Sequence, residues 1–167
     1  MSTKFFQLTN LPPLSPEIIA DGLDDQFEFT VSPYALAKRA SLFYETNFYK
    51  SLTDQFGEIR CKYFRNQANS YYDWHVDKTR QSALNWVIAT NPGAGTFFRD
   101  NNRSKFFWDL EEVAYSTLCP TLINTTQEHC VFNNYPKERT ILSLTVRGEN
   151  SYDTVLEFLQ SVNINQY

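Results

Sequence analysis

The sequence predicts an antiparallel all-β core, a sandwich or a barrel, over about residues 58–148. Strand-like segments recur there about every ten residues, and turn residues such as Asn91-Pro92-Gly93 separate them. Clear helical patterns lie outside this region. We therefore expect one domain, residues 1–167, with an N-terminal layer of helices and strands over 1–57 and a short C-terminal helix over 151–162.

The N-terminal layer begins with short elements. Residues 4–9 are predicted as a strand, which Leu11-Pro12-Pro13 ends. Ser15 and Pro16 have the residue types of a helix N-cap and a first helical position, so a short helix is expected after them. Alternating apolar and polar residues over 27–31 predict another strand.

The clearest helical pattern starts at Ser32-Pro33 and ends at Gly57, a natural C-terminal stop. Apolar residues recur in it at steps of three to five, which predicts one amphipathic helix of about 23 residues. The residues of this stripe are Leu36, Ala40, Phe43, Phe48 and Leu52. We expect this helix to cover one face of the sheet.

The core strands are expected at residues 59–63, 71–78, 82–90, 95–99, 104–108, 112–118, 121–133 and 139–147, with a break at Pro120. The last strand has two different faces, because alternate residues of a strand point to opposite sides. One face can pack on helices and carries Leu142, Leu144 and Val146. The other can line a barrel interior and carries Arg139, Ile141, Ser143, Thr145 and Arg147.

Charge and cysteine content limit the classes of function. The net charge of −4 gives no overall attraction to nucleic acids or anionic membranes. No apolar stretch approaches the roughly 18 residues of a membrane span, and no signal-peptide pattern is visible. The three cysteines form no Cys-x-x-Cys motif, so we expect free thiols and a cytoplasmic protein.

The two histidines of the chain, His75 and His129, suggest a metal site. His75 and Asp77 are two residues apart in a predicted strand, so their side chains would project from the same face. With His129 from a later strand they form a set of two histidines and one carboxylate. Such a set binds non-haem Fe(II) and leaves coordination positions open, although zinc could occupy the same ligands.

Arg139 begins the last predicted strand, ten residues after His129. An arginine on the inner face of a barrel needs an anion, because an unpaired buried charge is costly. A carboxylate that accepts two parallel hydrogen bonds is its natural partner. The sequence therefore predicts a metal site together with a carboxylate site.

These residues resemble the motif of the Fe(II)/2-oxoglutarate-dependent dioxygenase superfamily, over about residues 58–147. His75-Val76-Asp77 and His129 match its metal triad, and Arg139 matches the basic residue that binds the distal carboxylate of 2-oxoglutarate. Residues 93–98 are similar to its glycine-containing hairpin. The resemblance implies a double-stranded β-helix, or jelly-roll, core that uses Fe(II), 2-oxoglutarate and O₂.

Within the superfamily, Asn124 to Asn133 followed by Arg139 resembles the aspartyl/asparaginyl β-hydroxylase-like and small amino-acid hydroxylase branch. That branch implies hydroxylation of a protein side chain or a small amino-acid-like substrate, with release of succinate and CO₂. Its second basic residue has no counterpart in residues 82–90, so Arg80 is the nearest candidate for a further co-substrate contact.

Two alternatives stay open. Tyr63-Phe64-Arg65-Asn66 is similar to the first motif of the AlkB-type nucleic-acid demethylases, which makes Tyr63 a candidate to touch 2-oxoglutarate. Those enzymes carry two arginines six residues apart, whereas Arg139 and Arg147 are eight apart, and the acidic net charge argues against nucleic acid. The other alternative is a cupin-like barrel that binds a metal or ligand without oxidising it. Such a barrel has no need of Arg139.

Overall fold

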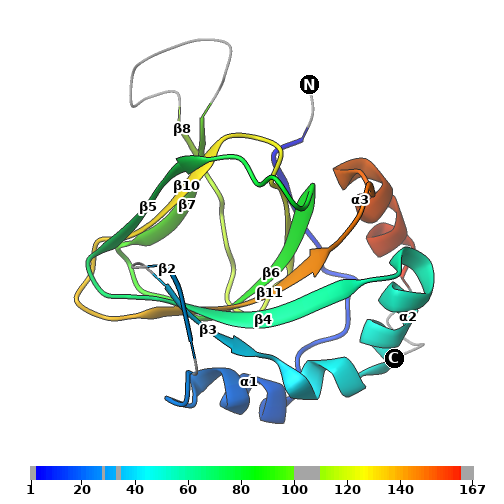
Figure 1. Ribbon diagram of the computed structural model, residues 1–167, viewed down its shortest axis with the longest axis horizontal. Coiled ribbons are helices and arrows are strands. Elements are labelled where there is room, and N and C mark those ends of the chain that lie inside the picture. The colour runs from blue at the N-terminus through cyan, green and yellow to red at the C-terminus, as the bar shows by residue number, and fades with distance from the viewer. Residues whose placement is uncertain (1–2, 28, 33–34, 100–109, 163–167) are drawn as a thin grey trace.

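The computed structural model describes residues 3–27, 29–32, 35–99 and 110–162. Two antiparallel β-sheets face each other in it (Figure 1). The large sheet has seven strands, in the order β1 (Phe5–Gln7), β9 (Thr121–Asn124), β6 (Ser82–Ala89), β11 (Arg139–Val146), β4 (Ile59–Asn66), β3 (Ala35–Arg39) and β2 (Phe29–Ser32). The small sheet has four, in the order β5 (Ser70–His75), β10 (His129–Asn133), β7 (Ala94–Arg99) and β8 (Leu110–Glu112). The prediction of an all-β core is confirmed.

Three helices lie outside the large sheet, on the side away from the small sheet (Figure 1). They are α1 (Pro16–Leu23), α2 (Asn47–Phe56) and α3 (Tyr152–Ser161). Each starts after a residue whose side-chain oxygen accepts a hydrogen bond from a backbone N–H of the first turn, namely Ser15, Thr46 and Ser151. Apolar residues of the helices and of the outer sheet face form the main core. The main core therefore lies between the helices and the large sheet, and the opposite face of that sheet is turned toward the small sheet.

The long helix predicted from Ser32 to Gly57 is wrong in its first half. Residues 35–39 form β3, which pairs with β4, and a 3₁₀ helix η1 (Ser41–Glu45) separates it from α2. A local apolar pattern does not contain this pairing, because β4 is distant in sequence and supplies the backbone partners. α2 ends as predicted, at Gly57 with φ of 76°. The N-terminal region is thus a mixture of strands and helices.

The core strands occur largely where predicted, with different ends. β5 stops at His75, and the segment predicted as one strand over 121–133 is two strands, β9 and β10, in different sheets. β8 is shorter than the predicted 112–118 and starts earlier, and the strand predicted at 104–108 lies outside the described residues. The C-terminal helix is confirmed as α3.

β11 lies between the main core on the helix side and the space between the two sheets. Its outward residues Leu142, Leu144 and Val146 belong to the main core. Its inward residues line a cavity, and they are Arg139, Ile141, Ser143 and Thr145, with Arg147 just beyond the strand. The two faces predicted from the alternating pattern are confirmed.

The described residues also bear on membrane insertion and on disulfides. No helix among them is long and apolar enough to cross a membrane. The three cysteines, Cys61, Cys119 and Cys130, are free thiols.

Candidate active site

The two histidines lie side by side on neighbouring strands of the small sheet. His75 ends β5 and His129 begins β10, and the two residues are direct partners in the antiparallel pairing. Their ring centroids are 4.3 Å apart. His129 is buried, whereas His75 is partly exposed. Strand pairing thus brings together two imidazoles that are far apart in the sequence.

A β-bulge in β5 sets the direction of His75. The pair after His75 and His129 is Tyr72 with Val131, so β5 carries one residue more than β10 between these two pairs. An extra residue of this kind re-aims the side chains next to it. Tyr72 and His75 therefore both line the same cavity, although residues three apart in a regular strand point to opposite faces.

Asp77 joins the histidines from the loop after β5. Its backbone N–H donates a hydrogen bond to the carbonyl oxygen of Thr125 at 3.0 Å, which ties this loop to the turn before β10. Its Oδ1 lies 4.0 Å from Nε2 of His75. One ligand atom from each of His75, Asp77 and His129 lies within 4.8 Å of the others. The three predicted ligands are brought together, with Asp77 on a loop rather than on the strand of His75.

A backbone carbonyl orients each imidazole ring. Nδ1 of His75 lies 2.6 Å from the oxygen of Asp73, and Nδ1 of His129 lies 2.9 Å from that of Gln127. A carbonyl oxygen only accepts hydrogen bonds, so Nδ1 carries the proton and Nε2 presents its lone pair. Burial lowers the pKa of His129, with the bond to Gln127 opposing this in part. A neutral ring with a free Nε2 is the form that binds metals.

Arg139 is a buried cation that forms no ion pair with the described residues. It is the first residue of β11 and is 1% exposed. Nε and Nη1 have no hydrogen-bond partner among the described residues. The guanidinium carbon lies 4.9 Å from the ring centroid of Tyr115. Burial lowers the pKa of Arg139, while Tyr115 and Glu112 oppose this. Such a group fits an anionic ligand that accepts two hydrogen bonds.

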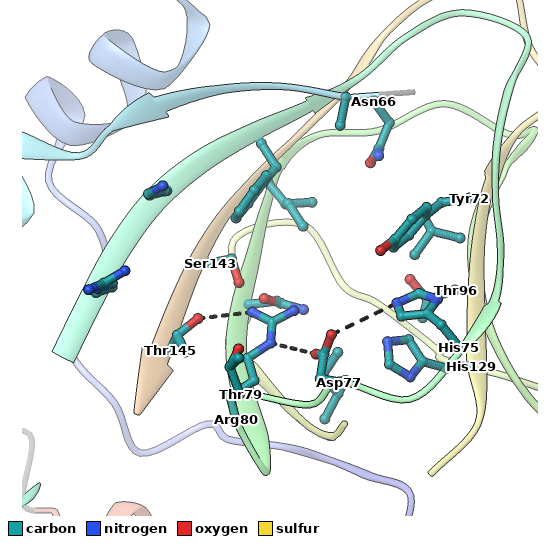
Figure 2. A pocket seen from close by; sticks show the side chains of 18 of the residues that line it. Asn66, Tyr72, His75, Asp77, Thr79, Arg80, Thr96, His129, Ser143 and Thr145 are labelled. Atoms are coloured by element: carbon teal, nitrogen blue, oxygen red, sulfur yellow. Dashed lines mark hydrogen bonds and ion pairs between the residues drawn. The ribbon is translucent and has the colours of Figure 1, made fainter. Parts of the chain in front are cut away.

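The histidine cluster and Arg139 line one cavity of about 340 Å³. Figure 2 shows His75, Asp77 and His129 together on one side of it. Its walls are the inner faces of the two sheets and the loop after β5. This size suits a small ligand. Around the cluster the wall residues are Tyr72, Asn85, Thr96, Ile123, Val131, Ile141, Ser143 and Thr145.

Arg80 also lines the cavity, and its partners are protein groups. Its Nε donates to Oδ2 of Asp77, and its Nη1 donates to Oγ1 of Thr145 at 2.9 Å. Figure 2 shows Asp77 with Arg80 on one side and His75 on the other. One oxygen of Asp77 is thus held by Arg80, which leaves Oδ1 on the side of the histidines.

Tyr63 lies on the wrong face of β4 to reach the cavity, so its suggested contact with a co-substrate is wrong. The side chain is fully buried against the helices, and its hydroxyl donates to the carbonyl oxygen of Ile18 in α1 at 2.7 Å. Its neighbours Lys62 and Phe64 point inward instead. Because side chains alternate along a strand, only one of these two sets can face the site.

The sequence did not point to two residues near Arg139, which are Asn85 on the cavity wall and Tyr115 beside the guanidinium. Asn85 is 3% exposed in β6, a strand whose other side chains are almost all buried and apolar. Its Nδ2 lies 3.3 Å from the hydroxyl of Tyr115, the residue that also stacks on Arg139. A single amide inside an apolar strand is the signal that could have indicated Asn85. Tyr115 has no such signal, because it lies outside the regular strands.

Solved structures of oxygenases have a similar fold. An oxidoreductase of the 2OG-Fe(II) oxygenase family from Burkholderia pseudomallei has a TM-score of 0.63 and 14% identity, over 90% of this chain and 87% of its own. A prolyl-4-hydroxylase from Pseudomonas putida has a TM-score of 0.63 and 13% identity, over 87% and 93%. A prolyl hydroxylase from Trichoplax adhaerens, in complex with a hypoxia inducible factor peptide fragment, has a TM-score of 0.59 and 13% identity, over 93% and 87%.

The chain has the double-stranded β-helix fold of these 2OG-Fe(II) oxygenases. Identities of this size establish the fold alone. No protein-family model and no curated protein matches the sequence. The residues in the cavity are therefore the basis for assigning an activity.

Proposed function

We propose that this protein is an Fe(II)- and 2-oxoglutarate-dependent dioxygenase that acts as a hydroxylase. The observation that carries the proposal is the position of Arg139. It is a buried guanidinium in the same cavity as His75, Asp77 and His129, and its Nε and Nη1 have no hydrogen-bond partner in the described part of the chain. A barrel that only binds a metal has no need of such a group. A co-substrate that binds the metal at one end and carries a carboxylate at the other needs both.

The residues present fit Fe(II) and 2-oxoglutarate. His75, Asp77 and His129 would hold the metal through two imidazole Nε2 atoms and Oδ1, and three protein ligands leave positions open. Arg139 would pair with the distal carboxylate of 2-oxoglutarate. When bound, the metal and co-substrate supply O₂ activation, with oxidative decarboxylation to succinate and CO₂.

The chain's own residues orient these groups and limit water. Arg80 fixes the carboxylate of Asp77, and the carbonyls of Asp73 and Gln127 fix the two rings. These outer contacts maintain the direction of all three ligands, and the two carbonyls also raise the basicity of the rings that donate to them. The apolar wall residues, Ile123, Val131 and Ile141, suit the carbon chain of a small co-substrate.

The class of hydroxylation is a prediction from sequence. The segment around His129 supports the aspartyl/asparaginyl β-hydroxylase-like and small amino-acid hydroxylase branch, hence a protein side chain or a small amino-acid-like substrate. The peptide-bound prolyl hydroxylase is compatible with either. The AlkB-type alternative loses support because Tyr63, which carried that resemblance, faces the helices.

The test is turnover of 2-oxoglutarate by purified protein loaded with Fe(II). We expect slow release of succinate without added substrate, because many oxygenases of this chemistry oxidise their co-substrate slowly alone. Isothermal titration should show 2-oxoglutarate binding that depends on the metal. Lys50→Gln serves as a control variant, because it removes an exposed cation on α2, outside the cavity. It should release succinate and bind 2-oxoglutarate as the wild type does. No turnover at any iron loading, together with no 2-oxoglutarate binding, would favour the cupin-like binding barrel.

A further inference from the structure

The charges that line the cavity are strongly unbalanced. Among its wall residues, five side chains are cationic and only Asp77 is anionic. The cations are Arg60, Lys62, Arg80, Arg139 and Arg147. This contrasts with the net charge of −4 of the whole chain. A concave site lined by one sign of charge attracts ligands of the opposite sign.

The proposed metal and co-substrate do not use all of these cations. Arg139 would pair with 2-oxoglutarate, and Arg80 is bound to Asp77. Fe(II) and doubly charged 2-oxoglutarate add charges that cancel each other. Three cationic side chains therefore remain, and all come from β4 and the end of β11: Arg60, Lys62 and Arg147.

Arg60 and Arg147 form a pair at one end of the cavity. Arg60 lies opposite Thr145 in the pairing of β4 with β11, and Arg147 is the next inward position after Thr145. Glu58 bridges the two. Its Oε1 lies 2.9 Å from Nε of Arg60 and 3.7 Å from Nε of Arg147. One carboxylate thus faces two guanidinium groups, and the pair keeps a net positive charge.

The terminal nitrogens of this pair are available to a ligand. Glu58 contacts each arginine through Nε, and no hydrogen bond within the described part of the chain uses the Nη atoms of either. Both side chains are partly exposed, at 48% for Arg60 and 36% for Arg147. Two forked guanidinium groups side by side match the oxygens of a carboxylate or a phosphate.

A chain of contacts connects the arginine pair to a metal ligand. Thr145, the strand partner of Arg60, accepts the hydrogen bond from Nη1 of Arg80, and Arg80 holds Asp77. A molecule bound by Arg60 and Arg147 would therefore extend along the wall of β11 toward Asp77.

We propose that the substrate carries an anionic group, a carboxylate or a phosphate, and that Arg60 and Arg147 bind this group at the open end of the cavity. The inference rests on the proposed function, because it treats the space beside His75, Asp77 and His129 as the substrate site. It narrows the substrate to an anion. Arg60 and Arg147 are then specificity-determining residues, separate from the arginine assigned to 2-oxoglutarate.

The experiment is calorimetric binding to protein loaded with Fe(II) and saturated with 2-oxoglutarate in the absence of O₂, so that Arg139 is already occupied. The probes are two pairs that differ in charge: phenyl phosphate with phenol, and N-acetylglycine with N-acetylglycinamide. We expect the anion of at least one pair to bind and its uncharged partner not to bind. The tighter anion identifies phosphate or carboxylate as the group recognised. Binding should weaken with added salt, since both arginines are partly exposed.

The double variant Arg60→Gln/Arg147→Gln should weaken anion binding by about ten-fold or more, because it removes charged hydrogen bonds. Lys50→Gln/Lys137→Gln removes the same charge from exposed positions outside the cavity and should leave it unchanged. All variants should keep the wild-type affinity for 2-oxoglutarate. Anions that bind the double variant as well as the wild type, or that bind neither, overturn the inference alone. Wild-type protein that binds no 2-oxoglutarate overturns the proposed function and this inference with it.

Discussion

His75 and His129 are direct partners across β5 and β10, with their ring centroids 4.3 Å apart. A metal bound by both rings would connect two neighbouring strands of the small sheet, one of which, β5, is an edge strand. Ligands that bind only the folded state stabilise it. The metal is therefore expected to raise the thermal stability of the protein as well as to support its chemistry.

His129→Ala should abolish specific metal binding while leaving the fold intact. The variant loses a direct ligand, so the fall in affinity should exceed the roughly 10–100-fold that loss of an outer contact causes. Calorimetry with Fe(II) measures the affinity, and circular dichroism checks the fold. The thermal stabilisation by metal should disappear in the same variant. Full Fe(II) affinity in the variant would show that the three residues are not the metal site.

Arg139→Leu should have opposite effects on stability and on co-substrate binding. Without 2-oxoglutarate, the unpaired buried cation is a cost to the folded state, so its removal should not lower the free energy of unfolding. With 2-oxoglutarate, a buried charged pair is lost, which is worth about 3–5 kcal/mol. Denaturation and calorimetry measure the two quantities. If 2-oxoglutarate affinity stays at the wild-type level, Arg139 does not contact it.

Arg80→Gln should weaken metal binding about 10–100-fold, because Arg80 orients the carboxylate of Asp77. Thr145→Val is the matched variant. It removes only the second partner of Arg80 and should have a smaller effect of the same sign. Both affinities can be followed by the electron paramagnetic resonance of Mn(II) as a substitute for iron. A loss of 2-oxoglutarate affinity with normal Mn(II) affinity would instead support a direct role of Arg80 in co-substrate binding.

Tyr63→Phe should lower the free energy of unfolding by about 0.5–1.5 kcal/mol, because the hydroxyl loses its buried hydrogen bond to Ile18. The affinity for 2-oxoglutarate should be unchanged, since Tyr63 lies on the helix side of β4. Urea denaturation and calorimetry test the two parts separately. Weaker 2-oxoglutarate binding at normal stability would contradict this placement.

Sequence patterns predicted best where the cause is local. The alternation along β11 correctly separated the residues that face the helices from those that line the cavity, because period-two alternation follows directly from strand geometry. The capping residue Ser15 and the stop at Gly57 were correct for the same reason. Each depends on a few neighbouring residues.

The failures have non-local causes. Residues 35–39 form a strand because β4 is beside them, and nothing in their own pattern contains that partner. His75 and Asp77 share one cluster through a bulge in β5 and a loop tied to Thr125, not through a regular strand. Tyr63 was suggested by a short motif that does not fix which face of β4 it occupies. Tyr115 lies beside Arg139 and Asn85 only because the fold brings these distant residues together.

The division of β11 between two faces affects how such a protein can change over generations. Substitutions at Ser143 or Thr145 alter the shape and polarity of the cavity, whereas their neighbours Leu142 and Leu144 pack on the opposite side. Tolerance to mutation should therefore vary with a period of two along this strand. Because the residues that hold the core are not the ones that meet the ligand, new substrate preferences can be acquired there at little expense in stability.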